Sequence, residues 1–450
     1  MSSSVISQAN IAVNRFGYGA RSDELQNAEQ APKTWIKAQL LPVHFTQTLP
    51  HSNDIIIENA KYQKQQKQQI TPVKTQQQMD NLLKAKRFPR NVSRKFYIDA
   101  LEQSIHSSHS VSWRLLDFFS NHFSVSSKGR LMIGLSATLE REAIASNMLG
   151  NFEDLLLAVE QHPAMLIYLN NEKSFGPNSK KAKRSKTGLN ENLAREILEL
   201  HTLGVDGTYT QEDVIELAKG ITGWSVKNPN KEPSAGFTFR DVGHEPGPRK
   251  LLGKMYAQVG IDQGKNMLRD LAMHPDTAKH VCYKLAHHFV SDNPPASLLA
   301  KMETTWLKKR GNMTQVMFCL FDAEEAWLDS RQKFKTPREF VISTYRALAP
   351  KKISYKALLD SLVSLGQEPF NAGSPAGYSD DIDDWLGGSA LMARIDWSTT
   401  MLGYSKRVNK VMELALGESV SEQTYQMVMR AESREQALSL LLMSPDFQWR

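Results

Sequence analysis

The densest group of side chains that could perform chemistry lies on one predicted helix, residues 190–201 (NENLAREILELH). At 100° per residue, Asn192, Glu196 and Glu199 form a narrow polar stripe opposite the apolar side of this helix. Two neighbouring carboxylates could bind a divalent metal ion, or act as acid and base if proximity separates their pKa values. The alternative is a solvated helix face, because Arg195 lies four residues before Glu199 and can form an ion pair with it.

Two histidines relate to this stripe in different ways. His122 follows apolar helical residues three, four and seven positions earlier, which is typical of a core histidine. Its functional alternative is a base or metal ligand that reaches the Glu196 side from a neighbouring helix. His201 lies roughly 140° from Glu196 in α-helical geometry, so the two could share a site only if the helix unwinds. The predicted site therefore uses Glu196 and Glu199 as acid, base or metal ligands, with Asn192 orienting and His122 supporting.

A second group of candidate side chains lies in a predicted loop, GHEPGPRK at residues 243–250. His244 is expected to support catalysis, and loops of this kind often carry binding residues. Glu245, Arg249 and Lys250, together with Arg195 of the helix, could converge on an anionic or hydroxylated substrate. A rigid proline-glycine turn with solvated charges accounts for the loop residues equally well.

The sequence contains none of the common catalytic or metal-binding motifs. There is no His-Glu-x-x-His, no Walker loop, no GxGxxG turn after a strand and no Gly-x-Ser-x-Gly elbow. His287 and His288 are adjacent on a predicted helix, so one of them should face outward, and Asp292 accompanies the end of that helix. The acidic stretch 370–388 lacks EF-hand spacing and is interpreted as a long surface loop over the helical core.

Composition excludes several classes of protein. The 450 residues carry a net charge of +7 and only two cysteines, so a disulfide framework is excluded. No apolar run approaches the length of a membrane span, so no membrane contact is expected. The start, MSSSVISQAN, lacks the pattern of a signal peptide. We therefore expect a cytoplasmic protein as the sequence is written, or an exported one if the true start lies upstream.

Hydrophobic periodicity predicts the fold class. Apolar residues recur at helical spacing through most of the chain, as at Val214, Leu217, Ala218 and Ile221. Strand-like alternation is scarce and is clearest at 237–239, where a short hairpin or extended loop is expected. The prediction is an all-α protein, a large multi-helix single domain with long surface loops and at most a minor β-hairpin.

Domain boundaries follow from two segments that interrupt the helical pattern. Residues 63–79 are rich in glutamine and predict a solvated segment or linker. Residues 174–188 contain the basic run KKAKRSK between glycines, which predicts an exposed loop. The remaining sequence shows no internal repeat, so residues 9–448 are expected to form the single helical domain.

The ends of two helices can be predicted around the polar stripe. Asn190 is a suitable N-cap for the first helix, and Gly204 supplies a left-handed stop after it. Thr210 then begins the second helix with Asp213 as its capping-box partner, although aspartate is shorter than the usual Glu or Gln. The stripe should therefore lie on a helix followed by a tight turn and a second helix.

These same residues carry a resemblance to a known family. The string NENLAREILELHTLGVDGTYTQEDVIELAKGITGW resembles the signature of the bacterial domain of unknown function 1800 family. Further blocks are similar to the family in order, from about residue 9 to 448. They include IAVNRFGYGARSDEL, LDFFSNHFSVSS, HEPGPRKLLGK, HPDTAKHVCYKLAHHFVSDNPP, TPREFVISTYRAL and SREQALSLLLMSPDFQ. Asn170, Glu245 and Tyr378 depart from the residues that relatives commonly have.

The resemblance implies architecture and surroundings rather than a reaction. Family members are often exported and often accompanied by a sulfatase-like protein, which makes such a companion a candidate partner. From the residues, we expect an enzyme acting on a polar or anionic small molecule or glycan, with or without a divalent metal ion. The alternative is a non-catalytic interaction protein that docks the sulfatase-like companion. Nucleic-acid binding is not favoured, because no aromatic platform accompanies the basic run.

Overall fold

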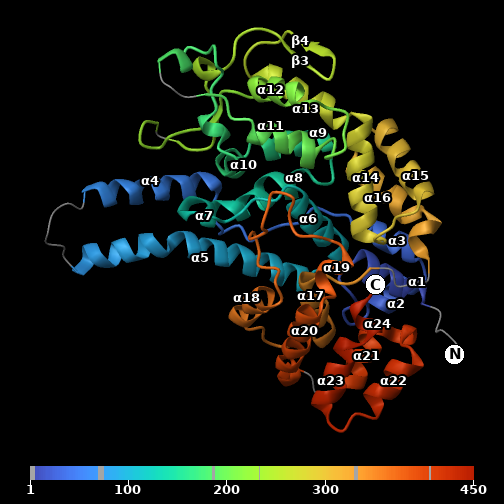
Figure 1. Cartoon of the computed structure of the whole chain (residues 1–450). Coiled ribbons are helices and arrows are strands. Elements are labelled where there is room, and N and C mark those ends of the chain that lie inside the picture. Colours follow the sequence, from blue (N-terminus) through green and yellow to red (C-terminus); the bar gives the residue numbers. More distant parts are fainter. Residues whose placement is uncertain (1–5, 69–75, 185–187, 233, 329–332, 405–406) are drawn as a thin grey trace.

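The computed structural model describes residues 6–68, 76–184, 188–232, 234–328, 333–404 and 407–450. They form a predominantly helical fold with two small two-stranded sheets (Figure 1). The prediction of an all-α fold with a minor β component is thereby confirmed. Within the described ranges, the structure contains no helix that combines the length and apolar character needed to cross a membrane.

A central group of helices lies between the other parts of the fold (Figure 1). It consists of α6 (Ser110–His122), α7 (Arg130–Leu139), α8 (Ala145–Asn147), α9 (Phe152–Glu160) and α10 (Pro163–Tyr168). Leu115, Leu116 and Phe119 of α6 are fully buried, as are Leu155 and Val159 of α9. The helical spacing of these residues gathers them on one side of each helix, which is why both helices pack into the core.

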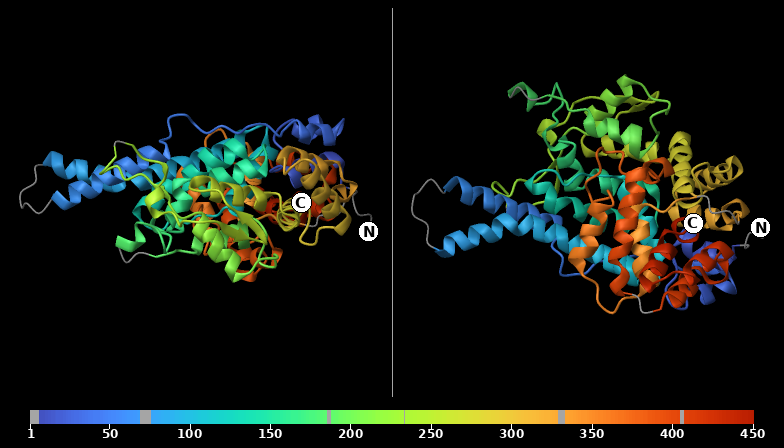
Figure 2. Two further views of the ribbon diagram at one scale, coloured as in Figure 1. Left: turned by 90° about the horizontal axis from the view of Figure 1, so that it is seen from above. Right: turned by 60° about the horizontal axis from the view of Figure 1, so that its bottom comes forward.

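Two long helices form an arm that projects from this body. Helices α4 (Ser52–Gln68) and α5 (Gln76–His106) run side by side in all the views (Figures 1 and 2). Helix α7 packs against the inner part of both helices. The glutamine-rich segment 63–79 ends α4 and begins α5, and its residues 69–75 lie outside the described part of the chain.

The helix that carries the polar stripe lies in the upper part of Figure 1. Helix α11 (Asn192–Glu196) is followed by α12 (Gln211–Gly220), and α13 (Ile261–Ala272) completes this group. The predicted capping box is present, because Thr210 accepts from Asp213 N while the Asp213 carboxylate accepts from Thr210 N. Val214, Leu217, Ala218 and Ile221 are fully buried, so the predicted apolar face of α12 is confirmed.

Two short antiparallel sheets border this group. Strand β1 (Trp224–Val226) pairs with β2 (Phe237–Phe239), with Trp224 opposite Phe239. The extended segment predicted at 237–239 is therefore a strand. Its antiparallel partner is the preceding strand β1, which follows α12. Strand β3 (Arg249–Leu251) pairs with β4 (Lys254–Tyr256). Short 3₁₀ turns also occur here, at Asn171–Lys173, Ala182–Arg184 and Asp241–Gly243.

The basic segment 174–188 runs along the loop that contains His244. Gly176 N donates to the carbonyl of Gly243 at 2.9 Å, and Lys181 N donates to that of Val242 at 2.8 Å. Lys180 and Lys183 are exposed, as expected for a basic surface loop. Residues 185–187 lie outside the described ranges.

The remaining helices complete the body on two sides. One side contains α14 (Pro275–Phe289), α15 (Ala296–Lys308), α16 (Met313–Asp322) and the 3₁₀ turn Glu324–Trp327. The N-terminal helices are α1 (Gln8–Ile11), α2 (Glu24–Glu29) and α3 (Pro32–Lys37). The C-terminal helices are α17 (Pro337–Leu348), α18 (Tyr355–Ser364), α19 (Ile382–Trp385), α20 (Gly388–Thr400), α21 (Val408–Leu416), α22 (Glu422–Met429), α23 (Arg434–Met443) and α24 (Pro445–Gln448), with 3₁₀ turns at Leu402–Tyr404 and Gly417–Ser419. The two ends of the chain meet, since Asn10 donates to the Leu416 carbonyl at 3.0 Å.

Three π-helical turns interrupt the α-helical pattern, at Ala12–Phe16, Glu140–Ile144 and Ile197–His201. Such turns are rare and occur often at functional sites, because the extra residue displaces the side chains that follow it. The first turn comes just before Tyr18, the second begins with Glu140, and the third ends with His201.

Candidate functional site

The polar stripe of helix α11 is part of an ion-paired surface network. The N-cap position is Glu191 and not Asn190 as predicted, although Asn190 Oδ1 still accepts from Asn192 N at 2.9 Å and satisfies one of the free amides at the helix start. Arg195 lies 3.2 Å from Glu199, so the predicted ion pair is present, and it also lies 3.4 Å from Glu191. Arg195 is 38% exposed and the Asn192 side chain is exposed, which makes this face a solvated one. The face can bind a ligand only if the ligand displaces these ion pairs.

Glu196 is partly buried, unlike the exposed Asn192. Burial raises the pKa of Glu196, while the charge of His201 lowers it. The helix widens into the π turn Ile197–His201, so α-helical spacing does not hold past Glu196. The predicted separation of His201 from Glu196 stays a prediction. His201 Nδ1 lies 2.8 Å from Glu160 Oε1, and both side chains are fully buried.

His122 lies at this same buried cluster. Its Nε2 is 3.2 Å from the carbonyl oxygen of His201, and its ring lies 6.2 Å from the rings of both His201 and His280. Burial lowers the pKa of His122 well below its usual range and that of His280 to about 4. His122 and His280 are therefore neutral at neutral pH. His122 approaches the signature helix through His201, and its assignment as a metal ligand with Glu196 and Glu199 stays a prediction.

The loop with His244 is held by hydrogen bonds to its surroundings. His244 Nδ1 lies 2.9 Å from the Thr222 carbonyl, and burial lowers the pKa of this histidine. The Glu245 carboxylate accepts from Asn178 N at 2.8 Å and from Asn178 Nδ2 at 2.6 Å. The side chains of His244 and Glu245 are both buried. The loop thus attaches the basic segment to the end of α12.

The two cations of this loop point to different neighbours. Arg249 lies 3.4 Å from Glu216 and donates to the Pro246 carbonyl at 2.9 Å. Lys250 is exposed. Burial alone would raise the pKa of Asp213 at the start of α12, but hydrogen bonds from Leu252 N and Thr210 lower it, and the charge of Lys250 contributes least to the lowering. Arg249 and Lys250 thus each serve a carboxylate of α12 in this structure, and their assignment to substrate binding stays a prediction.

A cavity of about 100 Å³ lined by both polar and apolar groups lies elsewhere, between α6, α14 and α17. Helix α6 contributes Asp117, Ser120 and Asn121, while Tyr18, Glu140 and Arg338 come from other parts of the chain. The segment 367–380 forms another wall, and with Asp381 we call this segment the cavity loop (residues 367–381). The space is enough for several water molecules or a small organic molecule.

One carboxylate of the cavity is fixed by two donors. Asp117 Oδ2 accepts from Arg338 Nε at 2.6 Å and from the Tyr18 hydroxyl. Burial and Asp117 raise the pKa of Tyr18 well above its usual value, so the phenol remains a donor. Burial alone would lower the pKa of Arg338, but the charge of Asp117 raises it. The net shift is upward, so the guanidinium stays charged. Asp117 is thereby held as an oriented carboxylate at the cavity wall.

The second carboxylate of the cavity has a very different environment. Glu140 is buried and accepts from Ser120 Oγ at 2.8 Å. Burial, followed by the charge of Asp117, raises the pKa of Glu140 to about 7. Glu140 can therefore either donate or accept a proton near neutral pH, next to a carboxylate fixed by Arg338. Two acids in such different environments are the usual arrangement of an acid–base pair.

A buried ionic cluster borders the cavity at Glu339. Glu339 lies 2.8 Å from Arg114 and 2.7 Å from Arg450, and all three side chains are almost inaccessible. Burial alone would raise the pKa of Glu339, but Arg450 and Arg114 together lower it to about 2. His288 Nδ1 lies 3.0 Å from Asp380 at the edge of the same cluster. This pair attaches the cavity loop to α14.

The cavity loop is also clamped to α6. Asn121 Nδ2 donates to the Tyr378 carbonyl at 2.7 Å, and Tyr378 N donates to Asn121 Oδ1 at 2.7 Å. The interpretation of 370–388 as a long surface loop holds up to Asp381, whereas residues Ile382–Trp385 form helix α19. Of the adjacent histidines, His288 is buried and His287 is partly exposed.

The cavity residues were not found from the sequence because they are far apart in it. Tyr18 and Asp117 are separated by 99 positions, and Arg338 lies a further 221 positions along the chain. The available signal was the resemblance itself. The blocks at 11–25, 116–127, 274–295 and 336–348 provide Tyr18, Asp117, His288 and Arg338, respectively.

Comparison with known proteins agrees with the family resemblance of these blocks. No curated protein and no solved structure matches the chain. A family model described as a protein of unknown function (DUF1800) matches residues 11–449, which is nearly the whole length. The chain therefore belongs to the DUF1800 family.

Proposed function

We propose that the protein is an enzyme that performs general acid–base catalysis on a small polar substrate in the cavity of Asp117 and Glu140. The observation that carries the proposal is Glu140, a buried carboxyl at the cavity wall with a pKa of about 7. A catalytic acid or base is most effective when its pKa lies near the working pH. Glu140 lines the cavity, so its carboxyl is within reach of a molecule bound there.

The other cavity residues suit particular roles toward a substrate. Asp117, oriented by Arg338 and Tyr18, is placed to accept a hydrogen bond from a substrate hydroxyl or to stabilise developing positive charge. Arg338 has further N–H donors that suit a carboxylate or phosphate group. The substrate class is therefore a small hydroxylated or anionic molecule, which agrees with the expectation from the sequence.

Substrate depletion by wild-type protein and a Glu140→Gln variant tests this proposal. The purified protein would be incubated with mixtures of sugars, hydroxy acids and phosphorylated sugars, and consumption would be followed by mass spectrometry. We expect Glu140→Gln to reduce turnover by about 10² or more, because the amide cannot transfer a proton. The matched control is Glu212→Gln, which neutralises an exposed glutamate of α12 and should leave turnover unchanged.

Two results would count against the enzyme. Turnover that persists in Glu140→Gln would remove Glu140 from the chemistry. Ligands that raise the melting temperature of wild-type protein without being consumed would instead indicate a binding protein, which is the non-catalytic alternative.

A further inference from the structure

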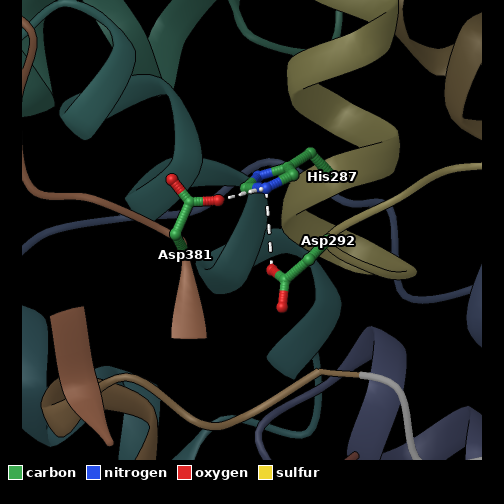
Figure 3. A group of neighbouring side chains, drawn as sticks. All are labelled: His287, Asp292 and Asp381. Carbon is green, nitrogen blue, oxygen red and sulfur yellow. Dashed lines mark hydrogen bonds and ion pairs between the residues drawn. The ribbon is translucent and has the colours of Figure 1, made fainter. Parts of the chain in front are cut away.

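A histidine and two carboxylates converge at the end of α14 (Figure 3). His287 lies in the last turn of the helix, Asp292 follows it, and Asp381 ends the cavity loop just before α19. His287 Nε2 lies 2.9 Å from Asp381 Oδ1 and 3.6 Å from Asp292 Oδ1. One ligand atom from each residue lies within 4.8 Å of the other two. His287 and Asp292 come from one segment, whereas Asp381 lies 94 positions after His287, so the tertiary fold brings Asp381 to the other two.

These separations are those of ligands around one metal ion. Nitrogen and oxygen ligands bind first-row divalent ions at about 2.0–2.2 Å, so two ligands at 90–120° lie about 2.8–3.8 Å apart. In the metal-free protein His287 Nε2 can share a proton with Asp381 only, while Asp292 Oδ1 pairs with Lys333 Nζ. A divalent cation between the three side chains would balance the charges of both carboxylates.

Neighbouring groups hold the three side chains in place. Lys333 Nζ donates to Asp292 Oδ1 and to the Asp380 carbonyl, and Asp381 N donates to Ser379 Oγ at 3.0 Å. The Tyr283 ring stacks on His287 with a centroid separation of 5.7 Å. Such outer contacts orient metal ligands in known sites. The charge of Lys333 also reduces the negative potential at Asp292, so we expect moderate rather than very tight binding.

We propose that His287, Asp292 and Asp381 bind one divalent first-row transition metal ion, Zn²⁺ or Mn²⁺, with water in the remaining positions. An imidazole ligand favours these ions over Ca²⁺ and Mg²⁺, which prefer oxygen ligands throughout. The inference is independent of the proposed acid–base activity, since it rests on a different group of side chains. It also moves the expected metal from Glu196 and Glu199 to the end of α14.

The bound ion would have a structural consequence for the cavity. Asp381 directly follows Ser379 and Asp380, which line the cavity wall. A metal bridge from Asp381 to His287 would therefore join the end of the cavity loop to α14, next to the His288–Asp380 pair. Metal binding is expected to stabilise the closed position of this loop.

Calorimetric titration of the full chain with ZnCl₂ or MnCl₂, after removal of metal with a chelator, tests the site. We expect one ion per chain and a rise in melting temperature on binding. Asp381→Asn should weaken binding at least tenfold while keeping the fold, because this side chain is 63% exposed. The matched control is Asp383→Asn, which neutralises an exposed aspartate two residues away and should bind like wild type.

Three results would overturn the proposal. Binding that is equally tight in Asp381→Asn and wild type would place the ion elsewhere. The absence of a stoichiometric transition with either metal would remove the site. Binding of Ca²⁺ with higher affinity than Zn²⁺ and Mn²⁺ would contradict the role of the imidazole.

Discussion

At the scale of the residue, Glu140 connects the proposed chemistry with stability. Its pKa rises from an ordinary 4.5 to about 7 because folding removes the carboxyl from water. The folded state therefore binds this proton more tightly than the unfolded state does. The resulting stabilisation is complete below about pH 4.5 and is lost as the pH rises through 7. A shift of this size corresponds to roughly 3 kcal/mol.

Glu140→Gln should remove this pH dependence. Because glutamine stays neutral, the unfolding free energy of wild type should fall relative to the variant by about 2–3 kcal/mol between pH 5 and pH 8. Urea unfolding at both pH values measures the difference, and Glu212→Gln should keep the wild-type profile. A difference between wild type and Glu140→Gln that does not change with pH would show that Glu140 titrates normally in the folded protein.

The same scale shows why charge alone did not locate the site. The acids of α11 and its π turn were predicted as the site because they are dense in the sequence. In the structure, however, Arg195 pairs with Glu199 and Glu191 at the surface. Exposed ion pairs of this kind contribute little to stability or to pKa values. Asp117 is the single acid of α6, whereas Glu140 shares its π turn with Glu142, and only the fold gives Asp117 and Glu140 a common environment.

At the scale of the element, local signals were reliable where the chemistry is local. The capping box of Thr210 with Asp213 and the buried faces of α6, α9 and α12 could be predicted, because caps and periodicity depend on neighbours in sequence. The π turns could not be predicted, since no capping or turn residue marks the point at which the extra residue is accommodated. The π turn Ile197–His201 nevertheless redirects His201, and another begins with Glu140.

The cavity loop provides an element-scale prediction through two of its glycines. Gly377 has φ +83°, and a Cβ there would lie 2.5 Å from both the carbonyl oxygen and Oδ1 of Asn121. Gly377→Ala should therefore displace the loop from α6 and cost about 1–3 kcal/mol. Limited proteolysis should then cleave the loop faster than in wild type.

Gly373 is the matched control in the same loop. A Cβ at Gly373 meets nothing within 4 Å, so Gly373→Ala should resist proteolysis as wild type does. Equal behaviour of the two variants would show that the Asn121 clamp does not hold the loop closed.

At the scale of the whole molecule, the positive charge is concentrated on the arm. Residues 61–95 contain ten Lys or Arg residues and one acid, a net charge of +9, whereas the whole chain carries +7. The rest of the chain is therefore slightly acidic. Arg87, Arg90 and Arg94 are exposed and lie along one side of α5, since they are spaced by three and four residues. Arg90 borders two surface hollows of about 520 and 460 Å³ on this side.

This distribution predicts that the arm dominates contact with sulfated polyanions. Changing Arg87, Arg90 and Arg94 to Glu should weaken binding to heparin about tenfold or more, because adjacent cations act together on a charged chain. The change Lys180→Glu, Lys183→Glu and Arg184→Glu alters the net charge equally, but lies on the separate basic loop, whose cations are also exposed. Heparin-column elution and titration at several salt concentrations compare the two triple variants. If both lose affinity equally, net charge governs the interaction; if only the arm variant does, α5 forms a localised anion-binding surface.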